Sequence, residues 1–553
     1  MKLNRSWIPA LVVALVALTS GGWLLQRGVQ DQGGAMFEAR LLQQVHRIVD
    51  ERYVDSIGSG KLYKMAIDGM LEELHDPYSV LLDSADWSDL QLSTTGNYGG
   101  LGIRIDKQGD WITVVDVLPD TPAEQEGLQT GDRILTVEGA SAQGWTTTKA
   151  VNTLRGPEGS SVQITVGRVG VDRPLSFSIE RRQVHVVSVQ SFMLRDHVGY
   201  VRLDQFSREA RQELQTAIDS LKSQGATRLV FDLRYNPGGL LEEGVAVADL
   251  FLPNGAPVVS TRGRVASENE TYDASEPDKY PGLPVVVLVN GYTASAAETV
   301  SGALQDHDRA LLVGTTTFGK GLVQSLYNLP GDNHLKLTTG RWYTPSGRDI
   351  QKPHGQQAEA NTLQASAVSM TGEPVRVEAD TANRKTYHTD DGRVVYGGGG
   401  ITPDLLIATD TLTSREQLLR SSLAKEGVTV SIAAFQFGVK WAKAHPDLPG
   451  DFQVTPAMRA AFLEALSEKA GSPVDRKLFD DSKPYVDWLL GYQVANAAFG
   501  EVAQLQRQFT LDDQLQRSVE LLAQASSPKQ LFALAEQQKS HAEGPATTPT
   551  SGR

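Results

Sequence analysis

The chain has 553 residues, which is too long for one hydrophobic core and predicts about three or four domains. Its formal net charge of −14 argues against a nucleic-acid partner, because phosphate binding requires a basic face. It contains no cysteine, which excludes disulfides, thiol catalysis, cysteine metal sites and a lipid-modified N-terminal cysteine.

The first residues have the pattern of a membrane anchor. Lys2 and Arg5 precede an apolar stretch from Trp7 to about Leu25, and roughly 20 apolar residues can cross a bilayer once. Because a positive flank stays cytoplasmic, we expect residues 1–27 to be an uncleaved anchor. The rest would lie on the extracytoplasmic, periplasmic side of a cell envelope. A cleavable signal peptide is the alternative, although a small-x-small cleavage site is hard to find.

Residues 28–96 are predicted to be a helical region. Apolar side chains recur at helical spacing in residues 41–49 and 62–74, and Asp76-Pro77 then interrupts the pattern. This region is a candidate dimerisation arm, but packing against the rest of the protein explains it equally well.

Short strands and turns dominate residues 97–182. Strands are expected at 111–117 and 161–166, with a short helix and a further strand between them. In Tyr98-Gly-Gly-Leu-Gly-Ile103, successive backbone N–H groups could form a nest for a carboxylate, next to a strand that could accept an extended peptide. For the hexapeptide alone, a structural turn is the alternative.

Residues 183–410 alternate between strands and helices, which predicts an α/β layer fold. The expected strands are 199–203, 228–234, 284–290 and 309–313, and the expected helices are 209–224, 240–251 and 296–305. A polar, irregular excursion is expected at 361–393. Residues 411–540 read as helical again, with a Thr413-Ser-Arg-Glu416 capping box and one long helix over 485–505. Residues 541–553 are expected to be a disordered tail.

Ser295 stands where an apolar run ends and a helix begins, and Lys320 follows it in a glycine-flanked loop. A serine hydroxyl is a poor nucleophile until a base removes its proton, and a strand-to-helix turn supplies free N–H groups. Lysine titrates near 10.4 when exposed, so its pKa must fall by roughly three units for it to act as a base near neutral pH. The amide of Gln324 could accept from the ammonium group.

A second loop offers backbone donors. In Asp232-Leu-Arg-Tyr-Asn-Pro-Gly-Gly-Leu240, Gly238 and Gly239 have no side chain that would block a substrate, so their N–H groups could face an oxyanion. A tight strand-to-helix turn without function is the alternative.

Taken in order, these motifs resemble a known family. Residues 119–139 resemble the core signature of a PDZ domain, and the combination with the Asn-Pro-Gly-Gly loop, Ser295 and Gly-Lys320-Gly-x-x-Gln resembles the C-terminal processing peptidases. The likeness includes Asp76-Pro-Tyr-Ser79 and Gly397-Gly-Gly-Gly-Ile-Thr-Pro-Asp404. The implied fold is multidomain α/β, with a crotonase-like β/α protease core at 183–410, an inserted, mainly β PDZ domain at 97–182, and helical N- and C-terminal regions.

The resemblance also implies the site residues and the partners. Ser295 would be the nucleophile, Lys320 the general base and Gln324 its orienting partner, with the oxyanion held by the N–H of Ala296 and of Gly238 or Gly239. The PDZ domain would bind the C-termini of polypeptide substrates and gate activity. No cofactor is expected, and a homo-oligomer or an activating adaptor protein is a candidate partner. The residues implied for the PDZ carboxylate loop are Leu101, Gly102 and Ile103, and Arg155 is a candidate switch contact between PDZ domain and core.

Other readings stay open at this point. A catalytically silent PDZ adaptor on the same fold would bind tails without cutting them, and an acyl-CoA enzyme on the crotonase core is disfavoured by the Ser-Lys pair. His307 could form a Ser-His-Asp arrangement, but its place at the end of a polar helix favours a solvated surface residue. No histidine pair or acidic cluster has metal-ligand spacing, so no metal is expected.

Overall fold

A computed structural model describes residues 36–353, 368–370, 375 and 384–542. It divides the chain into two compact units, one formed by residues up to 83 with 326–338 and the other by the remaining residues. The expected anchor at 1–27 lies outside the described residues, as does the tail beyond residue 542. Within the described ranges, no helix combines the length and the apolar character needed to cross a membrane.

The first unit contains the two expected helices and one strand that was not expected. Residues 36–52 are helical, and α2 covers Ser59–Glu72. After the break at Asp76, β1 (Val80–Leu82) pairs antiparallel with the first part of β18 (Asn333–Tyr343). The pairing joins segments more than 250 residues apart, which is why local helical spacing did not predict it.

The second unit begins with α3 (Ser84–Thr95) and a β-rich module that matches the expected PDZ segment. Its sheet has the order β3-β4-β5-β7-β8, so β3 lies at an edge, and helix α5 contacts β3. The first and last strands of this module, β2 and β9, pair with each other as a two-stranded antiparallel ribbon. The bounds are β2 Asn97–Gly100, β3 Ile103–Gln108, β4 Trp111–Val117, α4 Pro122–Gln125, β5 Arg133–Val137, β6 Ala140–Ser141, α5 Thr147–Leu154, β7 Ser161–Gly167, β8 Leu175–Glu180 and β9 Arg182–His185.

The α/β alternation predicted for the core is present as a six-stranded sheet with the order β10-β11-β12-β15-β16-β21. All neighbouring pairs from β11 onward are parallel, and β10 is antiparallel to β11. The bounds are β10 Val189–Met193, β11 Val198–Leu203, α6 Ala210–Ser223, β12 Arg228–Asp232, α7 Leu241–Asp249, β15 Val285–Val289, α8 Ala296–Asp306, β16 Leu311–Gly314 and β21 Leu405–Leu406. Further elements of this region are η2 Arg195–His197, β13 Pro257–Gly263, η3 Ala266–Glu268, β14 Thr271–Asp273 and β17 Leu322–Leu329.

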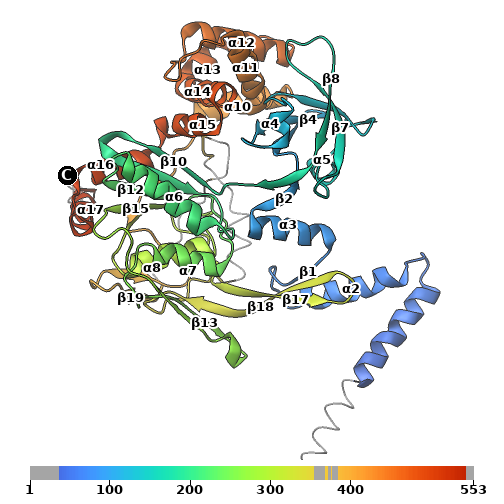
Figure 1. Ribbon diagram of the computed structural model, residues 1–553, viewed down its shortest axis with the longest axis vertical. Coiled ribbons are helices and arrows are strands. Elements are labelled where there is room, and N and C mark those ends of the chain that lie inside the picture. The colour runs from blue at the N-terminus through green and yellow to red at the C-terminus, as the bar shows by residue number, and fades with distance from the viewer. Residues whose placement is uncertain (1–35, 354–367, 371–374, 376–383, 543–553) are drawn as a thin grey trace, which may run out of the picture. The chain divides into compact units, whose positions relative to one another are not determined.

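Both faces of this sheet are buried, by different parts of the chain (Figure 1). Val285, Val287 and Val289 pack with α6, α7 and α8, whereas Val286 and Leu288 point the other way and pack with the last helices of the chain. A parallel strand covered on both faces reads as a continuous apolar run, which explains the sequence of β15.

The C-terminal helices are therefore not one separate domain. Helices α10 to α14 form a core of their own, while α16 and α17 complete the second layer over the central sheet. The predicted long helix over 485–505 is wrong, because Gly500 adopts φ 80° and divides it into α14 and α15. The bounds are α10 Ser414–Lys425, α11 Val430–Ala444, α12 Pro456–Ala470, α13 Arg476–Asp481, α14 Lys483–Phe499, α15 Glu501–Gln508, η4 Phe509–Leu511, α16 Asp513–Gln524 and α17 Pro528–Ala542.

The excursion expected at 361–393 ends in regular structure. Its first part lies largely outside the described residues, but β19 (Thr386–His388) pairs antiparallel with β20 (Val394–Tyr396). The connecting Asp391-Gly392, with Gly392 at φ 85°, is a hairpin signal that the sequence prediction did not use.

Candidate active site

The predicted nucleophile lies on a sharp turn between β15 and α8. Ser295 is the N-cap of α8 and adopts φ 56° and ψ −121°, a conformation that L-residues rarely hold. Strain of this kind costs about 1–3 kcal/mol and persists only where the surroundings enforce it. Thr293, two residues earlier, donates its hydroxyl to the Leu233 carbonyl at 2.8 Å, which ties this turn to the end of β12.

A buried carboxylate holds the Ser295 turn and the Lys320 loop together. One oxygen of Glu298 accepts from the backbone N–H of Ser295 at 3.0 Å and of Lys320 at 2.8 Å. Its other oxygen accepts from the Thr317 hydroxyl at 2.5 Å and the Gly319 N–H at 2.7 Å. All four donors are neutral. Glu298 is fully buried, and this burial raises the pKa of its carboxyl despite the four hydrogen bonds.

Glu298 is the residue at this site that sequence reasoning missed. It stands three residues after Ser295, and Ser-x-x-Glu at a helix start is the capping-box pattern. The same pattern was recognised at Thr413 and Glu416, so the signal was present in both places.

The predicted base and its partner are in contact. The Lys320 ammonium nitrogen lies 3.2 Å from the Gln324 side-chain oxygen, and both side chains are partly buried. Gly319, at φ 86°, permits the turn before the lysine, and a Cβ there would come within 2.7 Å of the Lys352 side chain. The structure therefore places the Lys320–Gln324 contact on the loop whose backbone Glu298 ties to the Ser295 turn.

The Asn236-Pro-Gly-Gly turn lies directly against Ser295. A Cβ on Gly238 would come within 2.7 Å of the Ser295 Cβ and 2.9 Å of the Ala296 nitrogen, so this position requires glycine. The Gly238 N–H donates to the side-chain oxygen of Asn236 at 2.8 Å. Within the described part of the chain, the N–H groups of Ala296 and Gly239 donate to no backbone acceptor. These two groups are therefore available as backbone donors on the turns flanking Ser295.

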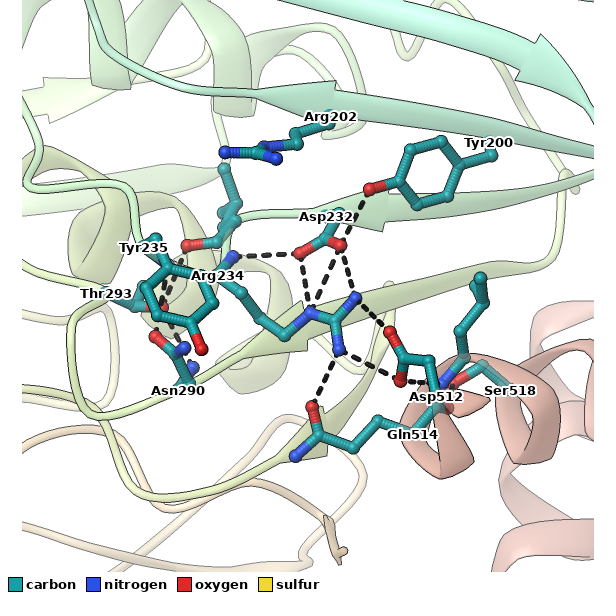
Figure 2. A network of polar contacts seen from close by, with 12 residues as sticks. Tyr200, Arg202, Asp232, Arg234, Tyr235, Asn290, Thr293, Asp512, Gln514 and Ser518 are labelled. Carbon is teal, nitrogen blue, oxygen red and sulfur yellow. Dashed lines mark hydrogen bonds and ion pairs between the residues drawn. The ribbon is translucent and has the colours of Figure 1, made fainter. Parts of the chain in front are cut away.

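Behind this turn, Arg234 lies in a network of charged groups (Figure 2). Its guanidinium binds the Asp232 carboxylate with distances of 2.7 to 3.1 Å. It also donates to Asp512 at 3.1 Å and Gln514 at 3.0 Å, at the start of α16. Burial disfavours the charged forms of both Arg234 and Asp232. Even so, Asp232 and Asp512 raise the pKa of Arg234 well above its usual range, and Arg234 lowers the pKa of Asp232 below the usual value for an aspartate.

The predicted peptide-binding loop has the expected backbone but one buried side chain. Gly102 adopts φ 82°, and a Cβ there would collide with Thr121 at 2.2 Å. Ile103 begins β3, the edge strand to which a peptide could be added. The Leu101 side chain, however, belongs to the core of the module, so only its main chain can line the loop.

Arg155 contacts helix α3 rather than the protease core. Its guanidinium donates to Asp89 at 3.0 Å and lies 5.1 Å from the ring centre of Tyr98. Helix α3 in turn reaches the core, because the Ser93 carbonyl accepts from the Gln205 side chain. A route from Arg155 to the core would therefore pass through α3.

His307 is not placed to act on Ser295. The two residues cap opposite ends of α8, which at about 1.5 Å per residue separates them by roughly 18 Å. His307 is not a solvated surface residue either, since its ring nitrogens lie 2.7 Å from an Asp390 carboxylate oxygen and from the Pro257 carbonyl.

One cluster of potential metal ligands occurs among the described residues, although sequence spacing predicted none. The ligand atoms of His185, Glu209 and Glu213 lie within 4.8 Å of one another. His185 hydrogen-bonds Glu213 at 2.5 Å, which accounts for their proximity. The cluster was missed because its members come from β9 and the start of α6, so the absence of a metal requirement stays a prediction.

Sequence comparisons place this arrangement among known proteins. Peptidase family S41 matches residues 197–358, the PDZ domain matches 89–167, and the activating protease CtpB N-terminal domain matches 24–85. The fold and the site thus define a serine peptidase with a PDZ domain.

Named relatives make the assignment more specific. A carboxy-terminal-processing protease of Bartonella bacilliformis is 42% identical over 307 residues, covering 55% of this chain and 70% of the relative. The carboxy-terminal processing protease CtpA of Bacillus subtilis is 32% identical over 348 residues, covering 62% and 74%. A solved photosystem II D1 C-terminal processing protease shares 29% identity over 56% of this chain and 90% of its own, with a TM-score of 0.34. The chain belongs to peptidase family S41, the C-terminal processing serine proteases.

Proposed function

We propose that this protein cleaves polypeptides near their C-termini with a Ser295–Lys320 dyad. One observation carries the proposal: the backbone N–H groups of Ser295 and Lys320 donate to the same oxygen of the Glu298 carboxylate. Neutral Lys320 would take the proton of Ser295 as its oxygen attacks the scissile carbonyl. Gln324 would orient the lysine through the contact at 3.2 Å.

The oxyanion of the tetrahedral intermediate would be held by two backbone N–H groups. We assign the N–H groups of Ala296 and Gly239, because the Gly238 N–H already donates to Asn236. Preorganised donors of this kind typically contribute about 10²–10³ in rate each. The amine leaving group would take the proton from Lys320, and water would then hydrolyse the acyl enzyme with Lys320 again as base.

The remaining modules would deliver the substrate. The PDZ domain would bind a substrate's C-terminal carboxylate at residues 101–103 and add the tail to the edge of β3. Gating by this domain, with Arg155 as a contact toward α3, is part of the proposal. We also propose that residues 1–27 anchor the protein in a cell envelope, with the catalytic part outside the cytoplasm.

The N-terminal unit is proposed to bind a second copy or an activating protein. In support, helix 36–52 exposes a group of large apolar side chains that its own unit does not cover: Met36, Phe37, Leu41, Leu42, Val45 and Ile48. The resemblance to the N-terminal domain of an activating protease points in the same direction.

Cleavage of casein by the full chain in mild detergent tests the proposal, with Ser295→Ala and Lys320→Ala alongside. We expect wild type to cleave casein in the presence of metal chelators, and both variants to lose at least about 10³-fold in rate. A wild type that binds C-terminal peptides but cleaves nothing would instead indicate a silent PDZ adaptor.

A further inference from the structure

The turn at residues 233–240, which carries the proposed oxyanion donor of Gly239, is called the oxyanion turn below. The C-terminal helices contribute two side chains, Asp512 and Gln514, that bind Arg234 in this turn (Figure 2). Arg234 binds Asp512 with both terminal nitrogens, at 3.1 and 2.8 Å, and Gln514 with one of them at 3.0 Å. These partners lie 278 and 280 residues further along the chain. The Asp512 side chain is 11% exposed, so the pair is shielded from solvent.

Arg234 is connected to the turn through short main-chain contacts. Its own N–H donates to Asp232 at 2.9 Å, which fixes the backbone where β12 ends. The Leu233 carbonyl next to it accepts from the Asn236 N–H at 3.3 Å and from the Thr293 hydroxyl. Asn236 then holds Gly238, so a displaced Arg234 would move the glycines beside Ser295.

The Arg234 side chain lies at a pocket of about 60 Å³, whose lining includes Tyr200, Tyr235 and Asp410. Space of this size can hold a water molecule. The guanidinium lies 5.9 Å from the ring centre of Phe509 and donates to Asp232, Asp512 and Gln514. These hydrogen bonds therefore contribute to the position of the side chain together with its packing.

Contacts of helix α16 with the rest of the protein fix the positions of Asp512 and Gln514. Asp512 caps the helix by accepting from the Leu515 N–H at 2.9 Å, and Gln514 donates to the Ile407 carbonyl at 2.8 Å. Leu515, Val519 and Leu522 are buried against the central sheet. Asp512 and Gln514 are thus held in place by contacts outside the turn that they support.

We propose that Asp512 and Gln514 are positioning residues for the oxyanion turn, so that the C-terminal helical region supports the catalytic centre from behind. They act through Arg234 and touch neither substrate nor the reacting atoms. The catalytic consequence rests on the proposed function, whereas the ordering of the turn does not.

The decisive variant is Asp512→Asn in the full chain. Asparagine caps helices as well as aspartate does, so the change removes the charge that faces Arg234 and keeps the cap. The matched control is Asp487→Asn, which removes an ion-paired carboxylate of the same region, 2.8 Å from Arg459 and not among the partners of Arg234. Hydrogen exchange of peptides covering 233–240, followed by mass spectrometry, measures the order of the turn. The kcat and KM values for a fluorogenic peptide measure the chemistry.

For Asp512→Asn we expect exchange over 233–240 to rise at least about threefold, and kcat to fall about tenfold with KM within about twofold of wild type. Asp487→Asn should leave both unchanged, and Gln514→Met should show the same pattern as Asp512→Asn with a smaller amplitude. The proposal is overturned if exchange over 233–240 stays at the wild-type rate, if kcat stays unchanged while exchange rises, or if the control behaves like Asp512→Asn. A wild type without cleavage would refute the proposed function alone, because the exchange measurement still decides whether Asp512 orders the turn.

Discussion

Glu298 and Asp232 are both buried carboxylates, one bonded to the Ser295 turn and the other to Arg234 at the start of the turn that contains Gly238, but they hold their turns by opposite means. Glu298 accepts only from neutral donors, all within residues 295–320, and burial raises its pKa. Asp232 faces the guanidinium of Arg234, which lowers its pKa and shares its charge with Asp512 of the C-terminal helices. The backbones of Ser295 and Lys320 are thus held by local hydrogen bonds, and the turn at residues 233–240 by a long-range ion network.

The largest effect should follow from removing the centre of the ion network. Arg234→Met removes the guanidinium that both buried carboxylates, Asp232 and Asp512, bind, and breaking a buried pair on one side typically costs about 3–5 kcal/mol. Chemical denaturation measures this free energy of unfolding. Arg459→Met, whose ion pair with Asp487 is more exposed, should cost about 1 kcal/mol or less. Equal costs for the two variants would show that the network is an ordinary surface pairing.

Replacing Glu298 should have the next largest effect. In Glu298→Gln, one acceptor oxygen becomes an NH₂ group that faces N–H donors, and each buried donor left without a partner costs about 1–3 kcal/mol. We also expect kcat to fall about 10²-fold, because small displacements of a nucleophile and its base have effects of this size. Denaturation and peptide cleavage measure the two quantities.

The control for this variant is the other capping box. Glu416 is also buried and accepts from the Thr413 N–H at 2.7 Å, at the start of α10. Glu416→Gln should cost about 1 kcal/mol and leave kcat unchanged. If Glu298→Gln lowered stability without lowering kcat, Glu298 would be structural only.

The hydrogen bonds of Glu298 and the ion network of Arg234 also differ in how far the sequence could predict them. The apolar run of β15, the helix after Ser295 and the glycines at 238 and 239 were found because each depends on local propensity. Glu298 carried a local signal too, since its spacing from Ser295 is that of a capping box. A capping box predicts only a helix start, and the contacts of Glu298 with Gly319 and Lys320 depend on the fold.

Asp512 and Gln514 could not have been found in this way. No periodicity or spacing connects Arg234 with a residue 278 positions later, and only the packing of α16 on the central sheet brings them together. The break at Gly500 within the predicted long helix is a milder case, since the glycine was visible but its φ of 80° was not.

The pH dependence of stability should have opposite signs for the two carboxylates. The folded pKa of Glu298 is raised, so its contribution to the unfolding free energy is full below the unfolded pKa near 4.3 and is lost as pH rises through the folded pKa. The folded pKa of Asp232 is lowered, so its contribution is present above about 3.9 and is lost as pH falls through the folded pKa.

Denaturation of wild type, Glu298→Gln and Asp232→Asn between about pH 3.5 and 7 tests this difference. The stability advantage of wild type over Glu298→Gln should grow on acidification, and the advantage over Asp232→Asn should shrink. Slopes of the same sign would mean that the two sites do not differ as described.

The smallest effect is expected outside both groups of contacts, where Arg155 meets α3. Asp89 is 73% exposed, so Asp89→Asn should change the free energy of unfolding by less than about 1 kcal/mol, and less still at high salt. If Arg155 is a switch contact, the variant should nevertheless change the stimulation of cleavage by a C-terminal peptide. Unchanged stimulation would remove Arg155 from the switch.

The central claim, that Lys320 activates Ser295, is tested most directly by covalent labelling. A fluorophosphonate probe reacts with activated serines, and intact-mass measurement followed by peptide mapping locates the adduct. We predict one adduct on Ser295 in the wild type, none in Ser295→Ala, and labelling at least about 10²-fold slower in Lys320→Ala. An adduct on another residue, or labelling of Lys320→Ala at the wild-type rate, would contradict the proposed dyad.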